Sequence, residues 1–380
     1  MAFEKFREWY DNRHQYQKEY KDRTRKKIVG FFCTYEPEEI LYAADILPVR
    51  IVGGHRAEDL SLANAHVFNM YCPFCRDALA QGLKGYYDYL DGLSIAERCL
   101  HIRQTYHSWT IHKELDWTHT IYMPYHVQSL DRAIPYLYEE LKVFKRSLEE
   151  WTGREITEDD LKRGITILNR NRRAMKKAFQ YSRSDPPRIT GSERFYMTTS
   201  SFFVDKEEHS RVVEEAINEL DGRKMDHEDK ARLMLIGSEN DDMEFVKMVE
   251  SMGASIVIDD HCTTTRYFWD EVDESADDPL LAIAERYVKR IPCPSCDWPE
   301  RKRFDRILQF VKDWNVQGAI LIQQKFCDPH EADTPFLKKF LEEHNIPTYQ
   351  LEFDVTVPIG SFKIRVEAFL ETLSGMEDFF

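Results

Sequence analysis

The feature that most constrains this chain is a pattern of strands, helices and cysteines that occurs twice. The motif Cys-Pro-Xaa-Cys stands at residues 72–75 and again at 293–296. In each half a helical stretch, a short apolar run and a third cysteine follow, Cys99 in the first half and Cys327 in the second. Such internal similarity with small insertions is typical of a duplicated unit. The sequence therefore predicts two structurally similar halves.

Each half predicts four strands that alternate with helices. The predicted strands of the first half lie at 27–33, 48–52, 89–95 and 118–123. Those of the second half lie at 232–237, 254–258, 318–322 and 347–353. Strands that alternate with helices pair in parallel. We therefore expect an α/β fold with two similar doubly wound, four-stranded parallel-sheet domains.

Changes in composition divide the chain into four predicted parts. They are an N-terminal helix (1–26), a first α/β domain (27–129), a charged and mostly helical insert (130–229) and a second α/β domain (230–380). We expect the insert to join the two domains and a cofactor to lie in the cleft between them.

The charge balance narrows the classes of partner. Asp and Glu number 67 against 52 Lys and Arg, which leaves a formal net charge of −15. Nucleic-acid binding needs a basic surface, so we expect no nucleic-acid partner. No apolar signal core or membrane-length apolar run occurs, which predicts a cytoplasmic protein away from membranes. In a reducing compartment, eight cysteines indicate metal binding or redox chemistry rather than disulfides.

Six cysteines are the candidate cofactor and metal ligands. Cys99 and Cys327 each follow a predicted strand, at the sheet edge where open α/β folds bind ligands. Each Cys-Pro-Xaa-Cys motif precedes a predicted helix, whose N-terminus stabilises thiolate. The candidate set is Cys72, Cys75, Cys99, Cys293, Cys296 and Cys327.

Thiolates in matched groups of three favour an iron–sulfur centre. A four-thiolate zinc site and a thioredoxin-like redox motif are alternatives, although structural zinc pairs usually lie closer together in the sequence. Cys33 and Cys262 each stand alone after an apolar run, so they are predicted to be core or supporting residues. His330 either donates to a cluster sulfur or caps the following helix.

Two nucleotide-binding motifs are absent from the sequence. Neither a phosphate-binding G-x-x-x-x-G-K-[ST] loop nor a G-x-G-x-x-G dinucleotide fingerprint occurs. ATP hydrolysis and nicotinamide chemistry are therefore not expected of this chain.

Several segments resemble the 2-hydroxyacyl-CoA dehydratase and benzoyl-CoA reductase family. They are residues 30–44, 47–50, 71–76, 89–92 and 326–330. The stretch from Cys72 to Trp109 is most similar to the C (gamma) subunit of ATP-dependent benzoyl-CoA reductases. The resemblance implies paired α/β domains and an iron–sulfur cluster on three cysteines, Cys72, Cys99 and Cys327. The additional Cys75, Cys293 and Cys296 resemble the branch with a double-cubane [8Fe-9S] cluster, and a single [4Fe-4S] cluster is the second expectation.

The resemblance also implies an activity and partners. The first expectation is an oxidoreductase subunit that delivers low-potential electrons to the ring of benzoyl-CoA or a close aryl-CoA, giving a cyclic dienoyl-CoA. The alternatives are a subunit of a 2-hydroxyacyl-CoA dehydratase, a stand-alone double-cubane reductase of small molecules, and a zinc-stabilised scaffold or electron carrier. Implied partners are a related family subunit in a hetero- or homodimer, ATP-hydrolysing activator subunits, ferredoxin and the acyl- or aryl-CoA substrate.

Overall fold

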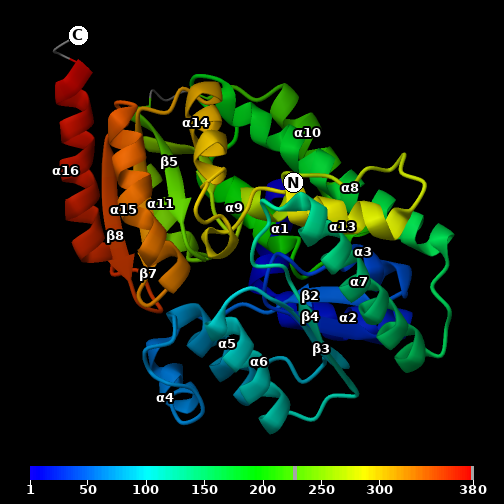
Figure 1. The fold of residues 1–380 in the computed structure, drawn as a ribbon. Coiled ribbons are helices and arrows are strands. Elements are labelled where there is room, and N and C mark those ends of the chain that lie inside the picture. The colour runs from blue at the N-terminus through cyan, green and yellow to red at the C-terminus, as the bar shows by residue number, and fades with distance from the viewer. Residues whose placement is uncertain (226–228, 378–380) are drawn as a thin grey trace.

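Two four-stranded parallel sheets organise the computed structural model, which describes residues 1–225 and 229–377 (Figure 1). The first sheet contains β1 (Ile28–Phe31), β2 (Leu47–Arg50), β3 (Gly92–Glu97) and β4 (Trp117–Tyr122). The second contains β5 (Ala231–Gly237), β6 (Ala254–Asp260), β7 (Gly318–Gln324) and β8 (Thr348–Phe353). All neighbouring strands pair in parallel. The predicted α/β fold with two similar doubly wound sheets is confirmed.

Both sheets have the same strand order, which places a ligand-binding crevice in each. The orders are β2-β1-β3-β4 and β6-β5-β7-β8. The chain runs outward in opposite directions from the central pair, β1 and β3 or β5 and β7. At such a switch point the loops after the two strands diverge and leave a crevice at the carboxyl edge.

Helices flank both sheets. Those that belong to the first sheet or precede it are α1 (Ala2–Asp11), α2 (Arg13–Thr24), α3 (Glu38–Ala43), α4 (Leu60–Ala63), α5 (Pro73–Leu83) and α6 (Leu100–His112). Four follow β4 before the second sheet begins: α7 (Leu130–Thr152), α8 (Glu158–Phe179), α9 (Gly191–Ser200) and α10 (Lys206–Asp221). The rest are α11 (Met243–Ser251), α12 (Thr265–Phe268), α13 (Pro279–Lys289), α14 (Arg303–Asp313), α15 (Asp328–Glu343) and α16 (Ile359–Glu377).

The four helices between the sheets contact both halves of the chain. Helix α8 packs against α3 of the first half and α13 of the second, and α7 packs against β4 and α13. Helix α9 packs against β6 and α11. Such contacts are expected of a helical insert that joins two domains. The exact boundaries of the four parts of the chain are not tested by these contacts and stay a prediction.

The N-terminal segment differs from the single helix predicted over 1–26. It forms two helices that meet at Asn12, which ends α1 and begins α2 with φ −108° and ψ 24°. Asn favours such positions because its side chain competes for backbone hydrogen bonds inside a helix. Phe6 and Trp9 on α1 are buried, so this first helix carries the apolar face.

The two Cys-Pro-Xaa-Cys motifs differ from each other in the helix that was predicted to follow each of them. Cys72 directly precedes α5, as predicted, but residues 294–296 form only a short 3-10 turn, and α14 begins at Arg303. Pro299 has no backbone N–H to donate within a helix, and it disfavours the helical backbone conformation of the residue before it. Asp297 accepts hydrogen bonds from the backbone N–H groups of Lys302 and Arg303, at 3.0 and 2.9 Å, so α14 starts beyond the motif.

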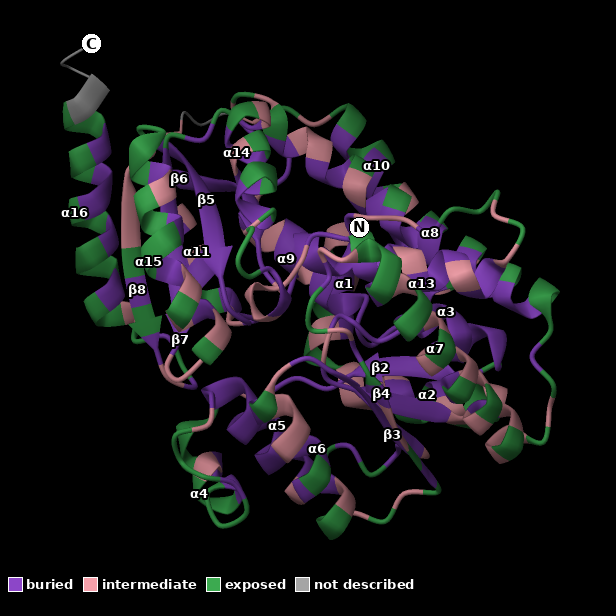
Figure 2. Cartoon of the chain, in the orientation of Figure 1, coloured by how far each residue is buried: buried purple, intermediate pink, exposed green. Residues whose placement is uncertain are grey.

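Burial sets the edge strands β4 and β8 apart from the other six strands (Figure 2). Every residue of the central strands β1, β3, β5 and β7 and of the edge strands β2 and β6 is buried, whereas the edge strands β4 and β8 include exposed and partly exposed positions. Central strands covered by helices on both faces have this continuous apolar character. None of the described helices has the length and apolar character that a membrane crossing requires.

Candidate functional site

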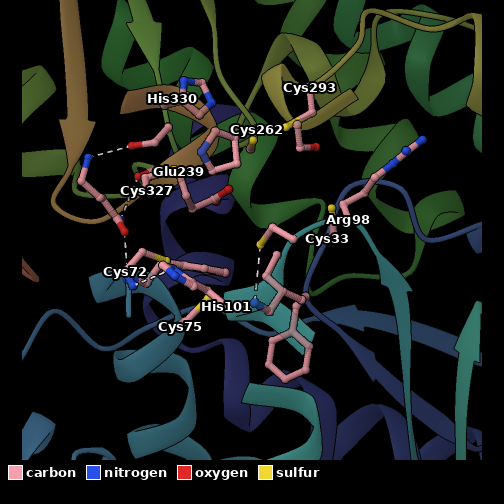
Figure 3. A pocket seen from close by; sticks show the side chains of 18 of the residues that line it. Cys33, Cys72, Cys75, Arg98, His101, Glu239, Cys262, Cys293, Cys327 and His330 are labelled. Carbon is pink, nitrogen blue, oxygen red and sulfur yellow. Dashed lines mark hydrogen bonds between the residues drawn. The ribbon is translucent and has the colours of Figure 1, made fainter. Parts of the chain in front are cut away.

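Seven of the eight cysteines line one cavity of about 390 Å³ between the two sheets (Figure 3). They are Cys33, Cys72, Cys75, Cys99, Cys262, Cys293 and Cys327. All eight are free thiols. Apolar side chains complete much of the wall, including Phe32, Phe74 and Ile102.

Strand ends bring four of these thiols together. Cys33 follows β1, Cys99 follows β3, Cys262 follows β6 and Cys327 follows β7, each within three residues of the strand end. The first pair flanks the switch point of the first sheet. Because carboxyl ends of parallel strands lie at one edge, and the two edges face each other, the four thiols converge.

The first Cys-Pro-Xaa-Cys motif places Cys72 at the N-terminus of α5. Its backbone N–H donates to His101 Nδ1 at 3.0 Å. Hydrogen bonds from the Cys75 thiol and then from His101 lower the pKa of Cys72 to about 5, against the effect of burial. Cys72 is therefore a thiolate at neutral pH, the form that binds metal.

In the second motif the pKa of the first cysteine, Cys293, is also lowered, but the neighbouring thiol is Cys262 and not the second cysteine of the motif. The hydrogen bond from the Cys262 thiol lowers the pKa of Cys293 well below its usual value. Cys296 lies away from the cavity: its Sγ is 3.6 Å from the Tyr35 hydroxyl, and Cys296 is only 1% exposed. The motif thus contributes one thiol to the cavity wall.

The structure brings together five of the six predicted ligand residues and leaves out Cys296. It adds Cys33 and Cys262, which were predicted to be core or supporting residues. The signal for Cys33 was its position at the end of the first strand, beside the switch point. That any of these thiols binds a cofactor stays a prediction.

A glutamine side chain connects the two halves beside the thiols. Gln324, the last residue of β7, accepts a hydrogen bond from the Phe74 backbone N–H at 2.8 Å through Oε1. Its Nε2 donates to the Glu239 carbonyl at 2.9 Å. The start of α5 is therefore held against the carboxyl edge of the second sheet (Figure 3).

An ion pair makes a second connection across the cavity. Arg50, at the end of β2, donates to Glu239 Oε2 at 2.6 Å, and both side chains are almost fully buried. The same guanidinium donates to the carbonyls of Phe32 and Cys262, at 3.0 and 2.9 Å. Arg50 therefore fixes the two backbone segments that carry Cys33 and Cys262.

Arg98 is a buried cation at the edge of the cavity, next to Tyr35 and Cys296, without a carboxylate partner in the described part of the chain. Its guanidinium lies 4.1 Å from the centre of the Tyr35 ring and donates to the Pro124 carbonyl. Its Nε and Nη2 are buried and have no hydrogen-bond partner among the described residues. A buried charge needs compensation, so the unpaired guanidinium favours negative charge on a nearby thiol or on a group bound next to it.

The donor set fits an iron–sulfur cluster. Soft thiolates in a largely apolar pocket are the ligands such clusters use. Residues 1–225 and 229–377 contain no group of three or more His, Cys, Asp or Glu side chains arranged to hold a metal ion. The fit rests on the seven thiols and on the unpaired Arg98 nitrogens.

His330 lies in the first turn of α15 with its side chain directed into the cavity (Figure 3). Arg266 Nη1 lies 3.3 Å from His330 Nε2. Burial, together with the nearby Arg266 and Arg303, lowers the pKa of His330 well below its usual value. The imidazole is therefore neutral, accepts from Arg266 at Nε2 and carries its proton on Nδ1.

Comparison with known proteins identifies the family of this chain. The family model described as "2-hydroxyglutaryl-CoA dehydratase, D-component" matches residues 33–373. The chain is 27% identical to the (R)-phenyllactyl-CoA dehydratase beta subunit of Clostridium sporogenes, over 98% of both chains. It is 26% identical to the (R)-2-hydroxyglutaryl-CoA dehydratase beta subunit of Acidaminococcus fermentans, over 92% of this chain and 93% of that one. It is 24% identical to a benzoyl-CoA reductase subunit of Thauera aromatica, over 86% of each chain. The chain therefore belongs to the 2-hydroxyglutaryl-CoA dehydratase D-component family, which confirms the resemblance found in its sequence.

Proposed function

We propose that this chain is the iron–sulfur subunit of an enzyme complex that delivers single low-potential electrons to an acyl- or aryl-CoA thioester. The observation that carries the proposal is the convergence of seven cysteine thiols on one cavity in a member of this family. A cluster bound there would supply one-electron transfer at low potential.

The protein's own contribution is charge compensation, hydrogen bonding and exclusion of water. Arg98 balances negative charge at the thiols, and Arg50 is already paired with Glu239. The hydrogen bond from the Cys75 thiol to the Cys72 sulfur withdraws electron density from that ligand. Burial and such hydrogen bonds are the means by which a protein tunes a redox centre.

Two chemistries on the thioester are supported equally by the relatives. Dehydration of a 2-hydroxyacyl-CoA is favoured by the two dehydratase beta subunits. Ring reduction of benzoyl-CoA, the first expectation from the sequence, is favoured by the benzoyl-CoA reductase relative. In both cases we propose a related partner subunit, separate ATP-hydrolysing activator subunits and reduced ferredoxin as the electron source, in the cytoplasm.

The first test is the metal content of protein purified without oxygen. We expect a brown sample that contains iron and acid-labile sulfide, with roughly eight irons per chain for a double cubane and four for a single cubane. A colourless sample that contains zinc and no iron would contradict the proposal and favour the scaffold alternative.

The second test separates the two chemistries. The complex, reconstituted with its partner and activator subunits, is incubated with benzoyl-CoA and, separately, with a 2-hydroxyacyl-CoA, and the acyl-CoA products are identified by mass spectrometry. Conversion of the hydroxyacyl-CoA alone assigns the dehydratase, and conversion of benzoyl-CoA alone assigns the reductase. Turnover of neither thioester contradicts the CoA-linked function.

A further inference from the structure

We infer that the cavity holds its cofactor between two groups of three thiols, and that the second group differs from the one the sequence motifs suggest. The first group is the family set of Cys72, Cys99 and Cys327. The second group is Cys33, Cys262 and Cys293. Cys75 and Cys296 are not ligands. The inference rests on the proposed function, because it requires an iron–sulfur cofactor in this cavity.

The three members of the second group lie together on one wall. All three line the cavity; burial and the nearby Cys293 raise the pKa of Cys33, and the neighbouring Cys293 thiol raises the pKa of Cys262. The Arg50 guanidinium donates hydrogen bonds to the carbonyls of Phe32 and Cys262. It therefore fixes the backbone next to Cys33 and at Cys262. These contacts orient three thiols toward the same space from β1, β6 and the second Cys-Pro-Xaa-Cys motif (Figure 3).

The first group lies on the facing wall. The thiols of Cys72, Cys99 and Cys327 interact electrostatically with one another. Two of them also interact with Cys293 across the cavity. The two groups are therefore close enough to share one polynuclear cofactor.

Cys296 is oriented away from this space by three contacts. Its Sγ donates to the Cys293 carbonyl at 3.3 Å and lies 3.6 Å from the Tyr35 hydroxyl. Gln128 donates to the Cys296 carbonyl at 3.2 Å, and the Cys296 side chain belongs to a buried hydrophobic cluster. Reaching the cavity would require Cys296 to break its contact with Tyr35.

Cys75 lines the cavity but supports a ligand instead of acting as one. It is 1% exposed, and its thiol contacts both the Cys72 sulfur and Thr105. A thiol that donates to a ligand sulfur stabilises the thiolate and adjusts the potential of the centre. Three thiols on each wall supply six ligands, the number implied by the resemblance to the double-cubane branch. In this assignment Cys33 and Cys262 replace Cys75 and Cys296, which the sequence motifs had suggested as ligands.

Serine variants test this assignment through metal content. Wild type, Cys33→Ser, Cys262→Ser, Cys75→Ser and Cys296→Ser are purified and reconstituted with iron and sulfide without oxygen. Iron and sulfide per chain and the electron paramagnetic resonance of the reduced protein are then measured. We expect Cys33→Ser and Cys262→Ser each to lose about half of the wild-type iron and sulfide, because one group of three ligands is broken. Cys296→Ser, the matched control within the second motif, keeps the full amount, as does Cys75→Ser.

A second measurement uses the wild-type protein and does not depend on whether a variant folds. Cys33 and Cys262 are partly exposed but the pKa of each thiol is raised, so prolonged labelling with iodoacetamide at alkaline pH should modify them in the apoprotein. Peptide mass spectrometry should show at least tenfold slower modification of both after reconstitution, whereas Cys296 stays unmodified in both forms.

Each outcome bears on the inference. Full iron in Cys33→Ser and Cys262→Ser, loss of iron in Cys296→Ser, or equal labelling of Cys33 and Cys262 in apo and reconstituted protein would overturn the ligand assignment and leave the proposed function standing. Wild-type protein that holds no iron would overturn both.

Discussion

At the scale of single residues, two buried titratable side chains have unusual environments, Arg98 at the cavity and Glu36 outside it. Arg98 is 2% exposed and has two guanidinium nitrogens without partners in the described chain. Glu36, by contrast, is a buried carboxyl that stays protonated. Each of these groups leads to a prediction, one electrochemical and one thermodynamic.

Replacing Arg98 should make the bound cluster harder to reduce. In Arg98→Gln a positive charge next to the thiols is lost, so the reduction potential should become more negative by on the order of tens of millivolts. A redox titration followed by electron paramagnetic resonance measures the shift. Arg103→Gln is the control, because Arg103 is half-exposed and pairs with Glu97 at 2.9 Å. Equal potentials in wild type and Arg98→Gln would contradict the role given to Arg98.

Glu36 should make the apoprotein less stable as pH rises. Burial raises its pKa from 4.5 to about 8, while Ser94 Oγ donates to its Oε1 at 2.6 Å. The folded protein therefore keeps a proton that the unfolded chain releases, and the free energy of unfolding falls between pH 4.5 and 8. Between pH 5.5 and 7.5 this loss amounts to about 2–3 kcal/mol.

Glu36→Gln removes this titration and keeps the shape of the side chain. Urea unfolding of the apoprotein across the same pH range should show the variant gaining stability relative to wild type as pH rises. A difference between the two proteins that stays constant with pH would show that Glu36 is ionised in the fold.

At the scale of elements, close helix packing positions the loop that carries Cys33. Helix α8 crosses α3 at Gly164, where an added Cβ would lie 2.2 Å from the Glu39 carbonyl oxygen. Arg172 of α8 also pairs with Glu39 at 2.6 Å, and both side chains are buried. The absence of a side chain at Gly164 therefore sets the distance between the two helices.

Gly164→Ala should destabilise the protein even though alanine favours helices. The methyl group meets rigid backbone, and overpacking of this kind costs about 1–3 kcal/mol. Gly222→Ala is the matched control, because its Cβ would have no described atom within 4 Å. We expect that control to be neutral or slightly stabilising by thermal and urea unfolding. Equal stability of the two variants would contradict the close contact.

At the scale of the whole molecule, contacts between the two halves create the cavity. The Arg50–Glu239 pair and the Gln324–Phe74 hydrogen bond join residues far apart in the chain. The insert helices α7 and α8 pack against both halves. The facing carboxyl edges of the two sheets are therefore held in one arrangement.

Breaking the Arg50–Glu239 pair should destabilise the molecule strongly. Arg50→Met leaves the buried Glu239 carboxylate without its cation, at an expected cost of about 3–5 kcal/mol. The double variant Arg50→Met/Glu239→Leu should be less destabilised than the sum of the two single variants, because no uncompensated charge remains. A double-mutant cycle by urea unfolding measures this coupling. Additive single effects would show that the pair contributes no coupling.

The sequence by itself determined the repeated βα order, the parallel sheets and the position of thiols at strand ends. These are local properties, since strand character, helix starts and motif spacing depend on residues close together in the chain. The family assignment also followed from local motifs such as residues 30–44 and 71–76. The single helix predicted for 1–26 was wrong because Asn12 divides it, and the second motif lacks an adjoining helix because Asp297 and Pro299 delay it.

Only the tertiary structure decided which thiols face the cavity. Cys296 contacts Tyr35, a residue 261 positions away in the sequence, and does not line the cavity. Arg50, which lies in the first half of the chain, donates to the Cys262 carbonyl in the second half and so positions Cys262 at the cavity. Side-chain orientation at such positions depends on contacts between distant segments, which the spacing of a motif does not encode. Two identical Cys-Pro-Xaa-Cys patterns therefore differ in what they present to the cavity, because their surroundings differ.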